Sequence, residues 1–458
     1  MTNNAGHSTF LQDVDELCSL TAQNVSRLIL RKSISVSDYL SALIKQIRRA
    51  EPSVNAWQYI DYERAYNYII KLEKEFSQTT VEGDLSQLYG IPFGIKDIFN
   101  TDDMPTEHGS PLFAKYMPGN DARVVTDLKR AGAIPLGKTV TAEFAVHKAG
   151  ATKNPLDLYR SCGTSSSGSA AAVASFMVPI ALSSQTASST IRPASYCGIY
   201  GYKPSFGLLP RTAMLKTTDT LDTVGIMARS VADLKMTFEQ LKVQGDNYPV
   251  INKEMLRPDR KKKKGENWCI GVLEGPKSSL EGKDVKAGLS QIVRLLSDEG
   301  CEVTNIKLPS FFDDAHNIHS KIYNKCLSYY FKTEWNIDPS KVSEIMSSMI
   351  EEGLRTSKDE YLEALNLQIE MAKILDEILE IVDVLICPSA ASEAPLGVDA
   401  VDIEDHSLIW TMCYCPSISV PILTGQNGLP VGVQVVSRRF NDYIALDFAE
   451  YLNSRVKR

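Results

Sequence analysis

The sequence predicts an α/β protein with the layout of a single large sandwich, in which helices cover both faces of a central β-sheet. Short apolar segments typical of strands alternate with amphipathic helical segments from one end of the 458-residue chain to the other. The chain holds no internal repeat and no low-complexity tract. The longest polar stretch, residues 244–267, separates apolar strands of similar character. We therefore expect an insertion-like linker within one domain that spans residues 1–458.

Hydrophobic periodicity places the individual elements. Apolar residues that recur at helical spacing predict helices, whereas short apolar runs bounded by Gly or Pro predict strands. The predicted helices cover residues 14–50, 60–76, 121–132, 168–177, 283–299 and most of 311–380. The predicted strands cover residues 89–97, 133–139, 178–186, 268–273, 301–309, 382–387 and 431–437.

The composition limits the classes of partner. The formal net charge is -7 and the isoelectric point is about 5.6, which argues against nucleic acid as the main partner, because phosphate binding needs a basic face. The run Lys261–Lys264 could dock an acidic partner but is more typical of a solvated loop. No apolar run approaches the ~20 residues of a membrane helix, and the N-terminus does not resemble a signal peptide. Scattered Cys residues fit a reducing compartment, so we expect a cytoplasmic protein.

Two hydroxyl-rich segments, residues 161–169 and 183–193, differ from ordinary serine-rich loops. They flank a small-residue helix and a buried strand, so their hydroxyl groups must find hydrogen-bond partners or cost about 1–3 kcal/mol each. A catalytic hydroxyl network would satisfy them. A histidine base is not evident, because no G-x-S-x-G elbow is present. His316 and His319 could share a metal on a helix, but no Cys or acidic signature completes the site, and we expect no metal.

A lysine is the alternative base. Lys96 follows a short apolar stretch, residues 89–95, and burial there would disfavour the charged ammonium and lower the pKa of the side chain. A neutral amine can accept a proton from a serine hydroxyl. A lone lysine at a strand end is more often exposed to solvent, so the local pattern alone leaves both interpretations open.

Four motifs in succession carry a family resemblance. GIPFGIKD, GTSSSGSAAAVA, the stretch from Gln185 to Pro193 and CGIYGYKPSFG resemble the amidase signature family, and the similarity extends from about residue 15 to about residue 455. The resemblance implies an α/β/α sandwich with a mixed central sheet and a signature core at about residues 85–235. It also implies that residues 268–458 shape the substrate pocket, and that a carboxamide is hydrolysed without metal or organic cofactor.

The resemblance assigns the catalytic residues. The family's lysine corresponds to Lys96 and its nucleophilic serine to Ser189. Its relay serine, which a cis peptide holds in the family, corresponds to Ser165. In this scheme Lys96 takes a proton from Ser165 while Ser165 takes one from Ser189 as it attacks the carbonyl carbon. Water then resolves the acyl-enzyme.

Further positions surround this triad. The backbone N–H groups that form the family's oxyanion hole correspond to Thr186, Ala187 and Ser188. We expect Ser166 and Ser169 to support the hydroxyl network. Arg192 could clamp a substrate carboxylate, as an arginine does in small-acid amidases, or could be structural. The sequence departs from the family where glycine is common, which predicts stiffer loops and a narrower pocket mouth, at Thr164, Ser167, Ala187 and Ser188.

The main functional prediction is an amidohydrolase that cleaves a small linear carboxamide and releases ammonia or an amine. Its expected partner is the small-molecule amide, and we expect neither a nucleic acid nor a membrane as a partner. A homodimer is expected by analogy only. One alternative is a protein that resembles the glutaminase component supplying ammonia for tRNA amidation, which would need a partner chain. The other is a catalytically silent binding protein that keeps the scaffold.

Overall fold

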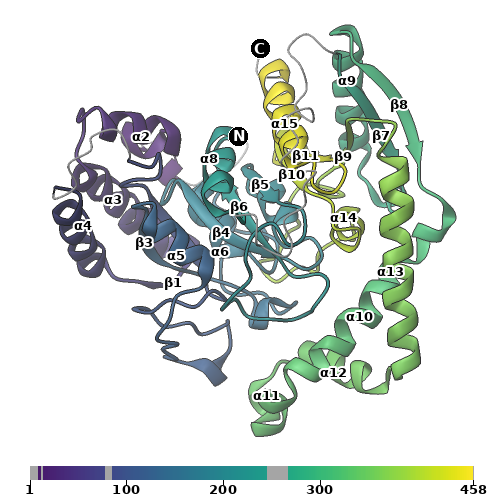
Figure 1. Ribbon diagram of the computed structural model, residues 1–458, viewed down its shortest axis with the longest axis horizontal. Coiled ribbons are helices and arrows are strands. Elements are labelled where there is room, and N and C mark those ends of the chain that lie inside the picture. The colour runs from purple at the N-terminus through teal and green to yellow at the C-terminus, as the bar shows by residue number, and fades with distance from the viewer. Residues whose placement is uncertain (1–8, 12–13, 78–84, 245–266, 457–458) are drawn as a thin grey trace, which may run out of the picture.

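Eleven strands form one mixed sheet within the part of the chain that the structure describes (Figure 1). This structure is a computed structural model, and it describes residues 9–11, 14–77, 85–244 and 267–456. The strand order is β1-β3-β2-β4-β6-β5-β10-β11-β9-β7-β8. The strands are β1 (Trp57–Ile60), β2 (Pro92–Lys96), β3 (Ile134–Thr139), β4 (Ile180–Gln185), β5 (Tyr200–Lys203), β6 (Thr223–Ala228), β7 (Cys269–Glu274), β8 (Glu302–Lys307), β9 (Val384–Pro388), β10 (Ser417–Thr424) and β11 (Pro430–Val436).

The sheet combines two parallel groups with an antiparallel middle. Strand β2 runs parallel to β3 and β4, and β7 runs parallel to β8 and β9, whereas the other neighbours are antiparallel. The predicted mixed sheet is therefore confirmed. Residues 245–266 of the predicted linker lie outside the described residues. Strand β7, which follows them, belongs to the same sheet as β1 to β6.

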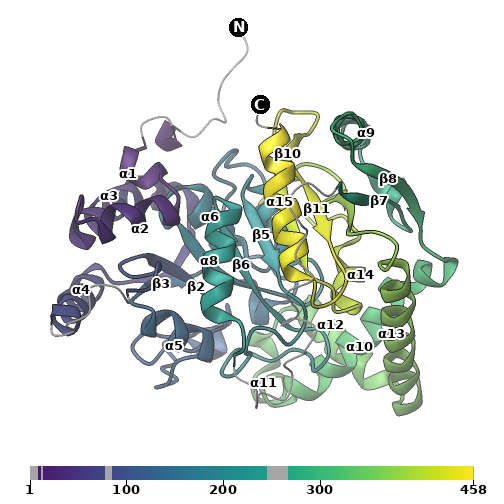
Figure 2. The ribbon, with the colours of Figure 1, turned by 45° about the horizontal axis from the view of Figure 1, so that its top comes forward.

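Helices cover both faces of this sheet, as predicted. Alternate side chains of β9 enter different cores. Val384 and Ile386 pack with helices α9 (Lys283–Asp298) and α15 (Asp442–Val456), whereas Leu385 and Cys387 pack with α10 (Ala315–Tyr330), α13 (Lys358–Ile378) and α14 (Ser407–Met412). Successive side chains of a strand point to opposite faces, so these two cores lie on opposite sides of the sheet. Figure 2 shows α8 and α15 side by side across one face.

The helices are shorter and more numerous than the periodicity predicts. Residues 14–50 divide among three helices because polar side chains cap new ones: Thr21 accepts the N–H of Asn24, and Ser35 and Asp38 form a capping box. The helices are α1 (Glu16–Ser19), α2 (Ala22–Leu30), α3 (Val36–Val54), α4 (Tyr62–Ser77), α5 (Arg123–Arg130), α6 (Ser167–Ala174), α7 (Ile191–Tyr196), α8 (Val231–Leu241), α9 (Lys283–Asp298), α10 (Ala315–Tyr330), α11 (Lys332–Ile337), α12 (Glu344–Arg355), α13 (Lys358–Ile378), α14 (Ser407–Met412) and α15 (Asp442–Val456).

None of the helices among the described residues has the length and apolar character needed to cross a membrane.

The register of β2 and β4 positions the functional residues. Ile95 of β2 pairs with Leu182 of β4 in parallel, so the carboxyl ends of the two strands meet at the same edge of the sheet. Lys96 is the last residue of β2, and Ser184 lies near the end of β4. Helix α6 begins beside them, and Gly168 in its first turn donates its N–H to the carbonyl of Val140.

Replacing Gly168 with alanine should destabilise the protein, because α6 approaches neighbouring backbone through this residue. A β-carbon there would lie 2.3 Å from the nitrogen of Val140 and 2.5 Å from the carbonyl oxygen of Ala56. We expect the free energy of unfolding to fall by about 1–3 kcal/mol in urea titrations. Gly288→Ala is the matched helical control, since its nearest neighbour is the end of the Leu423 side chain at 3.1 Å. Equal stability of the two variants would contradict the packing described here.

Candidate active site

The side-chain amine of Lys96 is the centre of the candidate site. Lys96 is fully buried, and its Nζ lies 2.8 Å from the Oγ of Ser165, 2.9 Å from that of Ser166 and 2.9 Å from that of Ser184. Ser184 comes from β4, whereas Ser165 and Ser166 immediately precede α6. Two parallel strand ends and one helix start therefore bring a single amine and three hydroxyl groups together.

Burial controls the protonation of this amine. Removal from water lowers the pKa of Lys96 well below its ordinary value of 10.5, while the negative charge of Asp222 acts in the opposite direction. The hydrogen-bond partners of Nζ are all hydroxyl groups, with no carboxylate in contact among the described residues. As an ammonium the amine donates to all three hydroxyls; as a neutral amine it would keep two N–H groups and one lone pair, so one of the hydroxyls would then donate to it. The site thus contains a hydroxyl group poised against a basic nitrogen.

Ser165 connects the amine to the neighbouring backbone. Its Oγ donates to the carbonyl oxygen of Ala145 at 2.9 Å, and its own carbonyl accepts the hydroxyl of Thr141 at 3.0 Å. The described backbone contains no cis peptide bond, so the cis peptide implied for Ser165 is wrong for this structure. The trans form is the lower in energy for a peptide bond that does not precede proline.

Ser189 lies in the loop between β4 and α7 and is half-buried. Among the described contacts it makes no hydrogen bond with Ser165, so the structure joins two members of the predicted triad and leaves the third apart. The side chain of Gln185 holds this loop, because its Oε1 accepts the backbone N–H groups of Thr190 and Ile191, each at 3.0 Å. Ser189 is thereby placed two residues before the start of α7.

The predicted oxyanion groups belong to the same loop. In the described part of the chain the N–H groups of Ala187 and Ser188 donate to no protein acceptor. Thr186 is anchored at both ends: its hydroxyl donates to Asp222 at 2.8 Å, and its carbonyl lies 3.0 Å from Nε2 of His319. Burial lowers the pKa of His319 to about 4, so the ring is neutral and its Nε2 is the donor to the carbonyl. A developing oxyanion would therefore meet the N–H groups of Ala187 and Ser188, because those of Thr190 and Ile191 are taken by Gln185.

A cavity of about 620 Å³ opens beside this loop. Ala187, Ser188 and Arg192 border it on the side of the sheet. The opposite walls come from α10, α12 and residues 399–404. Residues from the C-terminal part expected to shape the pocket, 268–458, therefore line this cavity.

Two acidic residues tie the cavity wall to the site loops. Arg192 bonds Asp405 through Nε at 2.7 Å and Asp402 through Nη1 at 3.0 Å. The hydroxyl of Thr164 donates to Asp402 and that of Ser188 to Asp405, each at 2.8 Å. Two side chains that stand where glycine is common thus tie the loops to Asp402 and Asp405, and the stiffer loops and narrower pocket mouth stay predictions. The double pairing of Arg192 favours its structural interpretation, and the carboxylate clamp stays a prediction.

The two serines expected to support the network occupy different places. Ser166 contacts Lys96 directly. The Oγ of Ser169 lies 2.7 Å from the Oγ of Thr139 and donates to the carbonyl of Leu182 at 2.9 Å, so it braces β3 and β4. Ser169 therefore acts on the strands rather than on the amine.

Sequence reasoning missed four residues of this site, and only one carried a usable signal. Ser184 lies in the hydroxyl-rich segment 183–193 at the end of a predicted strand, as a second partner of the lysine would. The other three are carboxylates that reach the site from distant segments, Asp222, Asp402 and Asp405. His316 and His319 both border the cavity, yet the described residues hold no group of His, Cys, Asp and Glu able to bind a metal.

An α/β/α enzyme that acts on carbon–nitrogen bonds is the class that this fold and site define. The chain belongs to the Amidase family, whose model matches residues 38–446. The resemblance seen in the sequence motifs is therefore confirmed.

Relatives whose names are more specific than the family name include A-subunits of glutamyl-tRNA(Gln) amidotransferase. The A-subunit 2 of this enzyme from Clostridium acetobutylicum is 26% identical over 93% of this chain and 97% of its own length. The A-subunit from Desulfatibacillum aliphaticivorans is 30% identical over 76% of this chain and 70% of its own. The crystal structure of the A-subunit from Thermotoga maritima has a TM-score of 0.76 at 25% identity, covering 95% of this chain and 94% of that one.

These relatives correct two predictions. The small-amide amidohydrolase was the wrong choice between the alternatives, because the relatives favour the amidotransferase component. The expectation of a small-molecule partner without nucleic acid was also wrong, since the relatives are named as one subunit of an enzyme that acts on a glutamyl-tRNA. Net charge misled here because it describes the whole chain and not the surface that a partner meets.

Asp222→Asn should move the acid limb of the pH–rate profile of amide hydrolysis to lower pH. The charge of Asp222 raises the pKa of Lys96, so without it the amine becomes neutral at lower pH. The measurement is kcat/KM against pH. Asp402→Asn is the control, because Asp402 borders the same cavity but is not among the charges that shift Lys96. A limb that stays in place or moves to higher pH in Asp222→Asn would contradict Lys96 as the base.

Proposed function

We propose that this chain is the glutaminase-type component of a tRNA-dependent amidotransferase, which releases ammonia from the side-chain amide of glutamine. The observation that carries the proposal is the buried amine of Lys96, held by serine hydroxyls beside a loop with unused N–H groups. The name shared by relatives that cover over nine-tenths of the chain supports the choice of glutamine over other amides.

The chemistry follows from the order of the groups. The Oγ of Ser189 attacks the amide carbon, and its proton passes to Ser165, which passes its own proton to the neutral Nζ of Lys96. The N–H groups of Ala187 and Ser188 stabilise the oxyanion, an effect worth about 3–4 kcal/mol per donor. The proton then returns to the amide nitrogen, and ammonia leaves. Water cleaves the glutamyl ester and restores the hydroxyl of Ser189.

This route requires two side-chain rearrangements. The hydroxyl hydrogen of Ser165 must turn from the carbonyl of Ala145 to Nζ of Lys96, which lies at an equivalent distance. The side chain of Ser189 must then reach Ser165. Catalytic hydrogen bonds of this kind are often long until substrate is bound, so the separation of Ser189 fits the role.

Ser189→Ala should abolish labelling of the protein by a serine-directed fluorophosphonate. The reagent needs a nucleophilic serine that a base activates. In the proposed triad that serine is Ser189. Intact-mass spectrometry gives the readout, and Ser290→Ala, an exposed serine of α9, is the control that should still be labelled. Absence of labelling in the unaltered protein would instead favour the catalytically silent binding protein.

Ammonia release from glutamine should depend on partner chains. We expect the chain co-purified with its native partners to hydrolyse glutamine at least about tenfold faster than the chain alone, a usual size for coupling between sites. An ammonia assay on both preparations measures the difference. Rapid turnover of simple amides by the isolated chain, unaffected by those partners, would contradict the proposal.

A further inference from the structure

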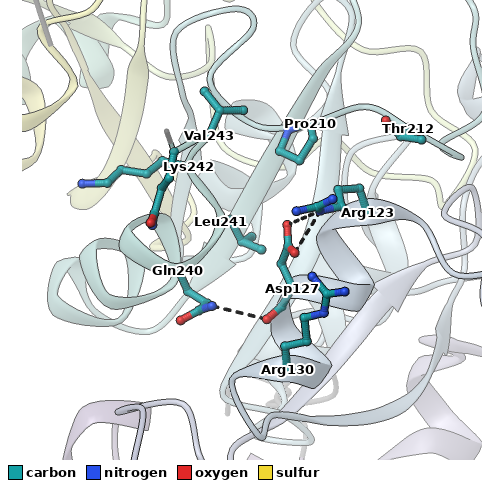
Figure 3. Close-up of a pocket in the computed structure, with 10 residues that line it drawn as sticks. Arg123, Asp127, Arg130, Pro210, Thr212, Gln240, Leu241, Lys242 and Val243 are labelled. Carbon is teal, nitrogen blue, oxygen red and sulfur yellow. Dashed lines mark hydrogen bonds and ion pairs between the residues drawn. The ribbon is translucent and has the colours of Figure 1, made fainter. Parts of the chain in front are cut away.

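A second cavity, of about 450 Å³, lies between α5 and the end of α8 (Figure 3). Arg123, Asp127 and Arg130 form one wall, and Gln240 to Gln244 form the other. Pro210 and Thr212 close the end between them. This cavity shares no lining residue with the one beside the loop of Ala187 and Ser188, and the proposed function makes no use of it.

Backbone hydrogen bonds hold the walls of this cavity in place. The N–H of Arg123 donates to the carbonyl of Thr212 at 3.1 Å, which fixes the start of α5 to the closing loop. The N–H of Val243 donates to the carbonyl of Leu208 at 2.8 Å, which fixes the chain beyond α8 to the same loop. A site held in this way needs little reorganisation to receive a ligand, and its volume suits a small molecule.

The positive charge of the cavity is only partly neutralised. Arg123 and Arg130 stand two turns apart on one side of α5, with Asp127 between them. Asp127 accepts from Nε of Arg123, at 3.0 Å to each oxygen, and the terminal nitrogens of that guanidinium bond no described residue. The guanidinium of Arg130 likewise has no hydrogen bond or ion pair with the described residues, whereas Lys242 is engaged by Glu239 and Tyr443. One carboxylate therefore faces two arginines.

The other residues that line the cavity indicate what kind of ligand would fit it. Leu241, Val243 and Pro210 offer apolar surface opposite the guanidinium groups, while Thr212 and the amide of Gln240 add neutral polar groups. Figure 3 shows the arginine side chains along one wall and the residues that end α8 along the other. A compact ligand with an anionic group at one end and a less polar body at the other would satisfy both walls.

We propose that this cavity binds a phosphate ester. Arginine forks match the oxygens of phosphate in paired hydrogen bonds, and the one arginine charge that Asp127 leaves unbalanced attracts the charge of about −1.5 to −2 that a phosphate monoester carries. The body of the ester lies against Leu241 and Val243. A free nucleotide and the backbone of an RNA both supply this chemistry, and binding measurements separate them.

Isothermal titration calorimetry with three probes tests the site: adenosine 5′-monophosphate, adenosine, and a short single-stranded oligoribonucleotide without a terminal phosphate. We expect the monophosphate to bind and adenosine to bind at least about tenfold more weakly, since the phosphate meets the arginines. Binding of the oligoribonucleotide together with failure of the monophosphate would identify an RNA backbone as the source of the phosphate. Failure of both phosphate-bearing probes at millimolar concentration would overturn the proposal.

Variants decide whether the bound probe occupies this cavity. Arg130→Gln should weaken binding of the phosphate-bearing probe by at least about tenfold, the loss of one charge-assisted fork. Arg123→Gln is a second variant at the same wall. Arg355→Gln removes an exposed helical arginine outside the cavity and should bind as the unaltered protein does. Unaltered binding by both cavity variants, with thermal melts that show a native fold, would place the ligand elsewhere and overturn the assignment.

Discussion

The enclosure of one amine by hydroxyl groups is the constraint on which the rest of the site depends. Lys96 can serve as a base only if it is uncharged, and a lysine loses its charge near neutral pH when it is buried without a contacting carboxylate. The parallel pairing of β2 and β4 meets both conditions, because it ends two buried strands beside the start of α6. The amine then finds Ser165, Ser166 and Ser184 in place of water.

Carboxylates that do not contact Lys96 hold the residues around the site in place. Asp222 holds the hydroxyl of Thr186, and Asp402 and Asp405 hold Arg192 between them. These contacts hold the side chains around the loop, while the N–H groups of Ala187 and Ser188 donate to no acceptor among the described residues. Because the acids reach neutral hydroxyls and an arginine rather than Lys96, they order the loops without giving the amine a counter-ion. Hydrogen bonds from Thr164 to Asp402 and from Ser188 to Asp405 explain how loops that carry side chains in place of glycine still form one site.

The sequence predicted those parts of the fold that have a recognisable local sequence pattern. Strand β2 and its terminal lysine stand out because apolar residues crowd around one cation, and the small residues of α6 mark a helix packed closely on the sheet. The four-residue strands β1 and β5 are too short to show alternation, and β6 is buried along its whole length, so its pattern has no polar face. Asp222 escaped prediction because its role arises only when β6 pairs with β4. The choice between small-amide hydrolase and amidotransferase component escaped too, because the relatives decided it and the hydroxyl cluster is compatible with both.

The protonation of Lys96 itself is the most direct test of its role as the base. Selectively ¹³C- and ¹⁵N-labelled lysine, with the Lys96 resonances assigned by their absence in Lys96→Met, allows its side chain to be titrated by nuclear magnetic resonance. We expect the side chain to lose its charge with a midpoint well below the ordinary value of 10.5. A side chain that stays charged up to that ordinary value would contradict the role, since no base would then remain to activate a serine.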